Sequence, residues 1–253
     1  MRLNTQCLLL IIVLSALSAC VAQNTNPYDN DSAARNQARV HTELGAAYLK
    51  ERKLAIALEE FNIATKTDPT YAMGYNGLGI VHAALGELDK ADAAYLKSIQ
   101  LEPNNSESHN NYGNFLCNNG RYDDSIKHFL EAVKNPLYTT PHMAYTNAGI
   151  CSNRKKDVVN AEKYFSLALQ IEPLNTTAAY QLANIQFNRG DALGAKNTLQ
   201  NALIASPNPE SLWLGVKIER ILGNKDNEAS YAIQLRKLYP NSVETQQLIN
   251  SQP

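Results

Sequence analysis

The chain has 253 residues, of which 44% are hydrophobic and 19% are charged, and its formal net charge at pH 7 is −1. This near-neutral balance gives no electrostatic reason to expect a nucleic acid as partner. Beyond the N-terminal segment, no apolar run is long enough to cross a bilayer as a helix. The composition is that of a globular chain, so its location should be set by its N-terminus.

The N-terminal segment MRLNTQCLLLIIVLSALSAC has a basic start and a short apolar core that ends in small residues and a cysteine. This layout is typical of an export signal, and the core is shorter than the ~20 residues of a membrane-spanning helix. The closing letters LSAC resemble the lipobox of bacterial lipoproteins, in which cleavage precedes a cysteine that is then acylated. The resemblance implies a signal peptide over 1–19 and lipidation of Cys20. An ordinary signal, cleaved near Ala19 or Ala22, is the alternative.

The residue after the cysteine bears on which membrane would hold the anchor. Val21 stands there, so the chain has no aspartate at the position that favours inner-membrane retention. We therefore expect an outer-membrane lipoprotein on the periplasmic face, held by several acyl chains. The stretch that follows, VAQNTNPYDNDSAARNQ, is polar and contains Pro27. It predicts a flexible tether over 20–37.

The rest of the chain is repetitive. The stretch LGAAYLKERKLAIALEEFNIATKTDP, from Leu44, aligns without a gap with LGIVHAALGELDKADAAYLKSIQLEP, from Leu78. Their shared skeleton of Leu-Gly, an aromatic residue or histidine, alanine, a second aromatic residue, a small residue and proline resembles the tetratricopeptide repeat (TPR). This register predicts a TPR array over 38–250, with repeats at about 38–71, 72–105, 106–141, 142–175, 176–209 and 210–243. In the last repeat it retains Trp213, Ala229 and Ile233, and it places Lys217 where a small residue should stand.

The residue types of the skeleton indicate how each repeat folds. Two antiparallel helices, A and B, cannot bury their own apolar faces, and stacking on neighbouring repeats buries them. Glycine or alanine at the eighth position lets helix A approach helix B, and the later aromatic residue fills the gap toward the next repeat. Proline near the end stops helix B. We therefore predict an all-α, right-handed superhelical solenoid of about six TPR helix pairs, with an unrelated helical bundle as the alternative.

Motifs for catalysis or metal binding are absent from the sequence. The five histidines occur singly, outside any HExxH or cysteine-rich pattern. The phosphate-binding, GxSxG and GxGxxG motifs do not occur either. His82 takes a position usually filled by a packed aromatic residue, which favours a core side chain over a ligand. We expect a binding protein that is not an enzyme and has no metal or cofactor.

The concave face of a TPR stack is lined by helices A, and here its positions are rich in asparagine. An asparagine side chain both donates and accepts hydrogen bonds, so it can hold the backbone of a bound segment. The alternative is that asparagine is simply common in this chain. The predicted protein-binding groove consists of Asn76, Asn110, Asn114, Asn118, Tyr180, Asn184, Phe187 and Asn188.

The two ends of the array differ from this pattern. Thr42 and Ala46 in the first repeat do not fit the carboxylate clamp that binds chaperone tails, which argues against that class of ligand. In the sixth repeat the concave positions become apolar. This apolar set indicates either a core covered by the C-terminal segment or a hydrophobic binding patch, and it comprises Leu214, Ile218, Ile221 and Leu222.

Cysteine usage predicts one disulfide. Cys7 would leave with the signal and Cys20 would be acylated, which leaves Cys117 and Cys151 in an oxidising compartment. Both fall on neighbouring helices A, where inward-facing residues can come within the ~7 Å between Cα atoms that a disulfide requires. We expect a Cys117–Cys151 bond across the only insertion in the array. Two buried thiols are the alternative.

The lipobox, tether and six repeats together resemble the type IV pilus biogenesis lipoproteins of the PilF/PilW family. The stretches NNYGNFLCNNGRY, NPLYTTPHMAYTNAGIC and LRKLYPNS look like that family's own variants, and the cysteine pair matches its pattern. The resemblance implies an outer-membrane pilotin that binds the type IV pilus secretin and promotes its localisation and multimerisation. Its partners would be the secretin and the lipoprotein sorting machinery. The alternative is a TPR lipoprotein adaptor that organises other envelope machinery, such as peptidoglycan enzymes or outer-membrane protein assembly.

Overall fold

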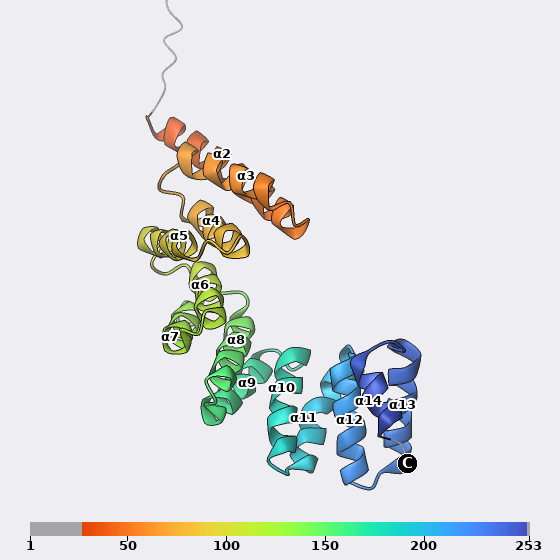
Figure 1. Ribbon diagram of the computed structural model, residues 1–253. Helices are drawn as coiled ribbons and strands as arrows, with labels where there is room; N and C mark the ends of the chain where they lie inside the picture. The colour runs from red at the N-terminus through yellow and green to blue at the C-terminus, as the bar shows by residue number, and fades with distance from the viewer. Residues whose placement is uncertain (1–26, 252–253) are drawn as a thin grey trace, which may run out of the picture.

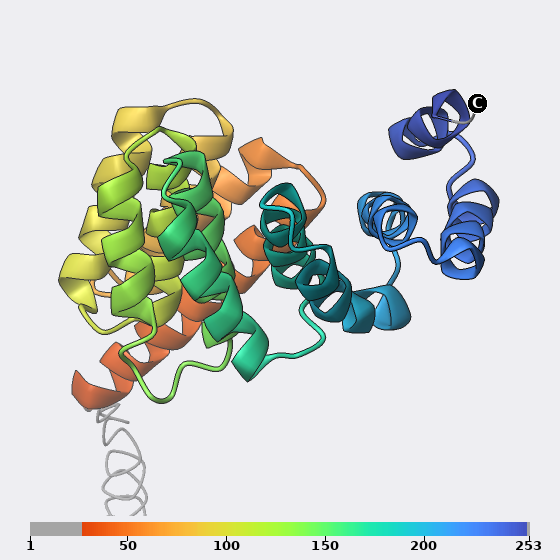
Figure 2. The same ribbon diagram turned by 90° about the horizontal axis from the view of Figure 1, so that it is seen from below.

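The computed structural model describes residues 27–251, and over this range it consists of thirteen helices without strands. The helices are α2 (Pro27–Lys50), α3 (Leu54–Thr67), α4 (Ala72–Ala84), α5 (Leu88–Leu101), α6 (Ser106–Asn118), α7 (Tyr122–Ala132), α8 (Pro141–Arg154), α9 (Val158–Ile171), α10 (Thr176–Asn188), α11 (Ala192–Ala205), α12 (Pro209–Ile221), α13 (Lys225–Leu238) and α14 (Val243–Asn250). Six antiparallel pairs follow one another from α2/α3 to α12/α13, and α14 comes last. Figures 1 and 2 show the pairs stacked into a curved array, so the predicted superhelical TPR solenoid is confirmed.

In five of the six pairs a glycine on helix A lies under an aromatic ring of helix B. A Cβ atom added to Gly79 would lie 2.7 Å from the ring of Tyr95, and one added to Gly149 would lie 2.6 Å from the ring of Phe165. Such distances leave no room for a methyl group, so glycine is what allows the two helices to approach closely. The fifth repeat makes the same contact with Ala183 and the smaller Leu199, both of which are buried.

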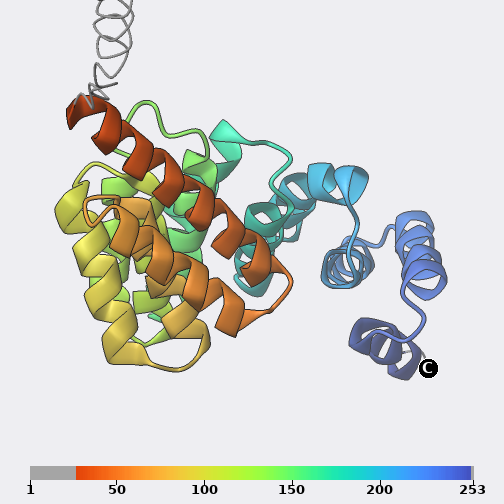
Figure 3. The same ribbon diagram turned by 90° about the horizontal axis from the view of Figure 1, so that it is seen from above.

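The first helix corrects the predicted tether. α2 begins at Pro27 and runs without a break into the first repeat, so the prediction of a flexible segment up to residue 37 is wrong for 27–37. Proline is well tolerated in the first turn of a helix because its missing N–H would have no intrahelical partner there. Figure 3 shows α2 lying beside α3 at the opposite end of the array from α14. The remainder of the predicted tether, the signal peptide and Cys20 lie outside the described residues.

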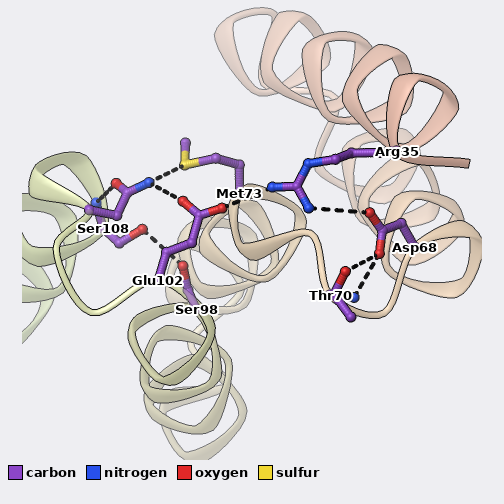
Figure 4. Close-up of polar contacts among 8 residues, drawn as sticks. Arg35, Asp68, Thr70, Met73, Ser98, Glu102 and Ser108 are labelled. Carbon is purple, nitrogen blue, oxygen red and sulfur yellow. Dashed lines mark hydrogen bonds and ion pairs between the residues drawn. The ribbon is translucent and has the colours of Figure 1, made fainter. Parts of the chain in front are cut away.

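Arg35 connects this polar stretch to the rest of the array. Its guanidinium lies 3.7 Å from the Asp68 carboxylate and donates a hydrogen bond of 3.2 Å to Glu102 (Figure 4). It also lies over the ring of Tyr71, 5.4 Å from the centroid. The first helix therefore contacts the connections that follow repeats one and two, and its polar residues serve tertiary contacts that composition alone does not reveal.

The sixth repeat corrects the predicted register. Gly215 on α12 faces Tyr231 on α13, with the same sixteen-residue separation as the glycine–ring pairs of earlier repeats. The prediction that Lys217 takes the small-residue position is therefore wrong by two residues, and Ile233 is 62% exposed. The connection 206–208 between α11 and α12 is one residue shorter than the corresponding connection 172–175. Gly215 is also one position nearer the start of α12 than Ala183 is to the start of α10, and the two differences together give the shift of two residues.

The register shift also decides what the apolar residues of the sixth repeat do. Leu214 and Ile218 are each 1% exposed and pack against the core of the fifth repeat, so they are neither under the C-terminal segment nor part of a binding patch. Ile221 and Leu222 remain exposed. The last helix, α14, instead covers other α12 residues through Leu248 and closes this end of the stack.

Candidate protein-binding groove

Three adjoining hollows form a groove along helices A of repeats two to five. The largest, which we call the central hollow, has a volume of about 810 Å³ and lies between the first turn of α6, the connection 135–140 and α8. A second hollow of about 410 Å³ lies between α4, α5 and α6 and shares Asn111 with the first. A third, also about 410 Å³, lies between α8 and α10 and shares Met143 with the first. Each of the two smaller hollows therefore adjoins the central hollow.

Two of the predicted groove asparagines are buried. Asn76 is 2% exposed and its carbonyl oxygen accepts a hydrogen bond of 3.4 Å from the Asn111 side chain. Asn110 is 8% exposed and accepts one of 3.0 Å from Asn147. Asn76 lines none of the three hollows, whereas Asn110 lines the central hollow with its carbonyl oxygen already bonded. Their carbonyl groups bond an asparagine of the next helix A and so tie successive repeats together.

Asn114 and Asn118 do line the groove, in the second hollow beside Phe115. The Asn118 carbonyl oxygen accepts a hydrogen bond of 2.7 Å from Arg154 on α8, so it also connects repeats three and four. Asn114 is half-buried on the same hollow. This part of the groove combines an apolar base with amide groups, which suits a peptide backbone.

The four predicted residues on α10 belong to a different part of the array. Tyr180 and Phe187 pack against the core shared by repeats five and six, and burial raises the pKa of Tyr180. The Lys217 amine lies 5.4 Å from the centre of the Phe187 ring, and burial lowers the pKa of this amine. Asn184 is half-buried and Asn188 is exposed. The structure therefore does not bring the eight predicted residues into one site.

Sequence reasoning missed the wall of the central hollow. Two extra residues in the stretch NPLYTTP separate repeats three and four, and the connection that contains them places Leu137, Tyr138 and Thr140 around the hollow. The insertion was visible in the sequence. That it encloses a hollow could be learned only from the positions of the neighbouring helices.

A buried disulfide joins two of the helices that border the groove. Cys117 on α6 and Cys151 on α8 are bonded, with their Cα atoms 5.8 Å apart. They lie in a buried cluster with Phe129, Ala148 and Tyr164. The bond joins repeat three to repeat four across the insertion, so it restrains the two helices that border the central hollow.

Two histidines of the third repeat lie against each other, one on α6 and one on α7. The Nδ1 atoms of His109 on α6 and His128 on α7 are 2.8 Å apart, and the rings are stacked. Burial, and then the neighbouring His109, lower the pKa of His128 to about 4. Among residues 27–251, no group of three or more histidine, cysteine, aspartate or glutamate side chains is placed to hold a metal ion. The same range contains no helix long and apolar enough to cross a membrane.

Comparisons with known proteins agree with this architecture. Three family models, each described as tetratricopeptide repeat, match residues 72–105, 94–127 and 114–176. The type IV pilus assembly protein PilF of Pseudomonas aeruginosa is 28% identical over 242 residues, which cover 94% of this chain and 96% of that protein.

Solved structures give the same result. The structure of Pseudomonas aeruginosa PilF aligns with a TM-score of 0.76 and 27% identity, covering 88% of this chain and 99% of that one. The crystal structure of PilW, a widely conserved type IV pilus biogenesis factor, aligns with a TM-score of 0.71 and 28% identity, covering 84% and 98%. The repeats, their order and these full-length alignments together make the chain a tetratricopeptide repeat protein homologous to PilF.

Proposed function

We propose that this protein is an outer-membrane lipoprotein that acts as a scaffold in type IV pilus biogenesis, binding the pilus secretin and promoting its localisation and multimerisation. The observation that carries the proposal is the similarity to PilF over 94% of the chain, because an alignment of that length includes the whole array.

The described residues support a binding role. They form a groove across four repeats with amide and apolar linings, and the disulfide restrains the helices at its centre. A TPR array binds through extended surfaces of this kind because each repeat adds a similar strip to the same face. The lipobox residue Cys20 would keep the groove and its partner beside the membrane.

The test is a semi-denaturing gel of outer membranes, probed for the secretin, from cells with and without the gene. We expect the heat-stable secretin multimer to disappear in the deletion strain while the monomer remains. A strain carrying Cys20→Ala should make a folded, soluble protein and misplaced secretin. The matched control is Cys7→Ala, which changes a cysteine inside the signal and should leave the multimer intact.

Intact, correctly placed secretin multimers in the deletion strain would overturn the proposal. The anchor and the array would then serve another partner in the envelope, and crosslinking from the groove would be the way to find it. Normal multimers in the Cys20→Ala strain alone would remove the carrier role of the lipid and leave secretin binding in place.

A further inference from the structure

We propose that the central hollow binds an extended segment of the partner protein and that this segment carries a lysine or an arginine. The inference rests on the proposed function for the identity of the partner, and it adds where and in what conformation the partner is held. It is carried by the shape of the hollow, by its unpaired polar groups and by its charge.

The hollow exists because of the insertion between repeats three and four. The connection that forms its wall is held by its own hydrogen bonds: the Asn135 side chain accepts from the Leu137 N–H at 3.0 Å, and the Asn135 carbonyl accepts from the Tyr138 N–H at 3.1 Å. The Thr140 carbonyl then accepts from the N–H of Met143, in the first turn of α8. The wall is therefore built in place, and the site does not require a partner to assemble it.

Polar atoms in the hollow lack partners within the protein. Asn110 uses its carbonyl oxygen and Asn111 uses its amide nitrogen in the contacts between repeats, which leaves the amide nitrogen of Asn110 and the carbonyl oxygen of Asn111 available. A ligand that bonds these two side-chain atoms is held and oriented in the hollow by one donor and one acceptor. Ser106 also lines the hollow, but its hydroxyl oxygen is buried beneath the surface and is not among the atoms that a ligand can reach.

This pattern of donors and acceptors fits an extended chain better than a helix. An extended backbone offers free N–H and C=O groups at close intervals, whereas a helix has already paired these groups internally. One donor on Asn110 and one acceptor on the neighbouring Asn111 match the C=O and N–H of a single peptide strand. Such recognition depends on the backbone, so it constrains the conformation of the partner more than its sequence.

The charge of the lining sets the sequence preference. The charged residues of the central hollow are Glu102 and Glu107, and no lysine or arginine lines it. Glu102 is paired with Arg35, whereas Glu107 forms no ion pair among the described residues. The third hollow adds Glu172 and likewise contains no lysine or arginine. Complementarity therefore favours a basic residue, whose aliphatic stem can lie along Leu137 and Met143.

The experiment measures binding of overlapping synthetic peptides that cover the periplasmic part of the secretin, using the full folded array. We expect the bound peptides to be basic, and Glu107→Lys to weaken their binding by roughly tenfold. The matched control is Glu59→Lys, because Glu59 is an exposed glutamate on α3 outside the hollows. A second variant, Thr139→Trp, fills the hollow from an exposed position on its wall and should also reduce binding.

The outcomes separate this inference from the proposed function. Peptides that bind equally to the protein, to Glu107→Lys and to Thr139→Trp would overturn the assignment of the central hollow. So would the absence of any bound peptide, or bound peptides without basic residues, when the gel shows that secretin multimers depend on the protein. Multimers that form without the protein overturn the proposed function itself, whatever the peptides do.

Discussion

Gly113 on α6 lies directly beneath the ring of Phe129 on α7, so close that a Cβ atom at this glycine would be 2.7 Å from the Cε1 atom of the ring. Substitution Gly113→Ala should therefore lower the free energy of unfolding by about 1–3 kcal/mol through overpacking. The measurement is urea denaturation. In the fifth repeat the corresponding positions are occupied by Ala183 and Leu199. Adding Phe129→Leu to Gly113→Ala should therefore restore part of the free energy of unfolding that Gly113→Ala removes. A double variant less stable than Gly113→Ala would show that the ring is not the obstacle.

The disulfide should contribute to stability through the unfolded chain. It closes a loop with a sequence separation of 34 residues, and its loss should lower the free energy of unfolding by about 2–4 kcal/mol. Denaturation with and without a reductant measures this contribution. The variant Cys117→Ser with Cys151→Ser is the control, because its stability should not respond to reductant. Equal stability of the oxidised and reduced protein would contradict the prediction.

The histidine pair predicts a loss of stability in mild acid. Burial lowers the pKa of His128 from 6.5 to about 4 in the folded protein, so between these values the unfolded chain binds a proton that the folded chain does not. The contribution of the neutral His128 side chain to the free energy of unfolding is fully present above pH 6.5 and is lost as the pH falls toward 4. Asp124 and Glu131 oppose this shift, whereas Arg121 adds to it.

The measurement for His128 is urea denaturation at several pH values from 7 to 5. We expect the free energy of unfolding to fall across this range, and His128→Gln to make the fall shallower. A wild-type protein with constant stability over the range would refute the lowered pKa. A His128→Gln variant with an unchanged slope would assign the effect to another group.

A buried carboxylate lies at the junction of repeats five and six. Glu219 is 1% exposed, and its carboxylate lies 3.0 Å from the Lys196 amine. Substitution Lys196→Met leaves this charge without its cation and should destabilise the protein by about 2 kcal/mol, a value reduced because Lys196 is partly exposed. Adding Glu219→Met should restore much of the loss. Lys134→Met is the control, because Lys134 pairs with Glu131 on the surface and should matter little.

The N-terminal part of α2 should depend on Arg35. Substitution Arg35→Ala removes the contacts to Asp68 and Glu102 and should increase hydrogen exchange over 27–37, with less than about 1 kcal/mol lost in global stability. The measurement is hydrogen exchange followed by mass spectrometry. Arg39→Ala is the matched control, because Arg39 pairs with Glu43 within the same helix. Equal exchange in the two variants would remove the role of Arg35.

The helix pairs could be predicted because the residues that hold each pair recur at a fixed spacing. Glycine and a ring sixteen residues later mark one repeat after another, and the close contact of Gly79 with Tyr95 is local to one repeat. A constant interval of 34 residues does not hold in the sixth repeat, where the connection before α12 and the first turns of α12 are each shorter by one residue. Gly215 and Tyr231 obey the rule, so the error was in counting.

The groove was less predictable than the fold. The position of a residue along helix A indicates which face of the array the residue lies on. It does not indicate that Asn111 would bond Asn76 or that Asn147 would bond Asn110. Burial of these amides depends on distances between repeats. The prediction of a flexible tether was wrong over 27–37 for a similar reason, because the contacts of Arg35 join positions far apart in the sequence. Composition carries no information about such contacts.

In a protein anchored through Cys20 as proposed, the early start of α2 limits the distance between the array and the membrane. With Cys20 acylated as proposed, only residues 21–26 separate the anchor from Pro27, and a fully extended stretch of that length reaches about 20 Å. From there α2 continues for 24 residues as one rod, and Arg35 fastens it to Glu102 at the edge of the central hollow. A partner segment held in the groove, as proposed, would thus stay within a limited distance of the membrane that carries the anchor.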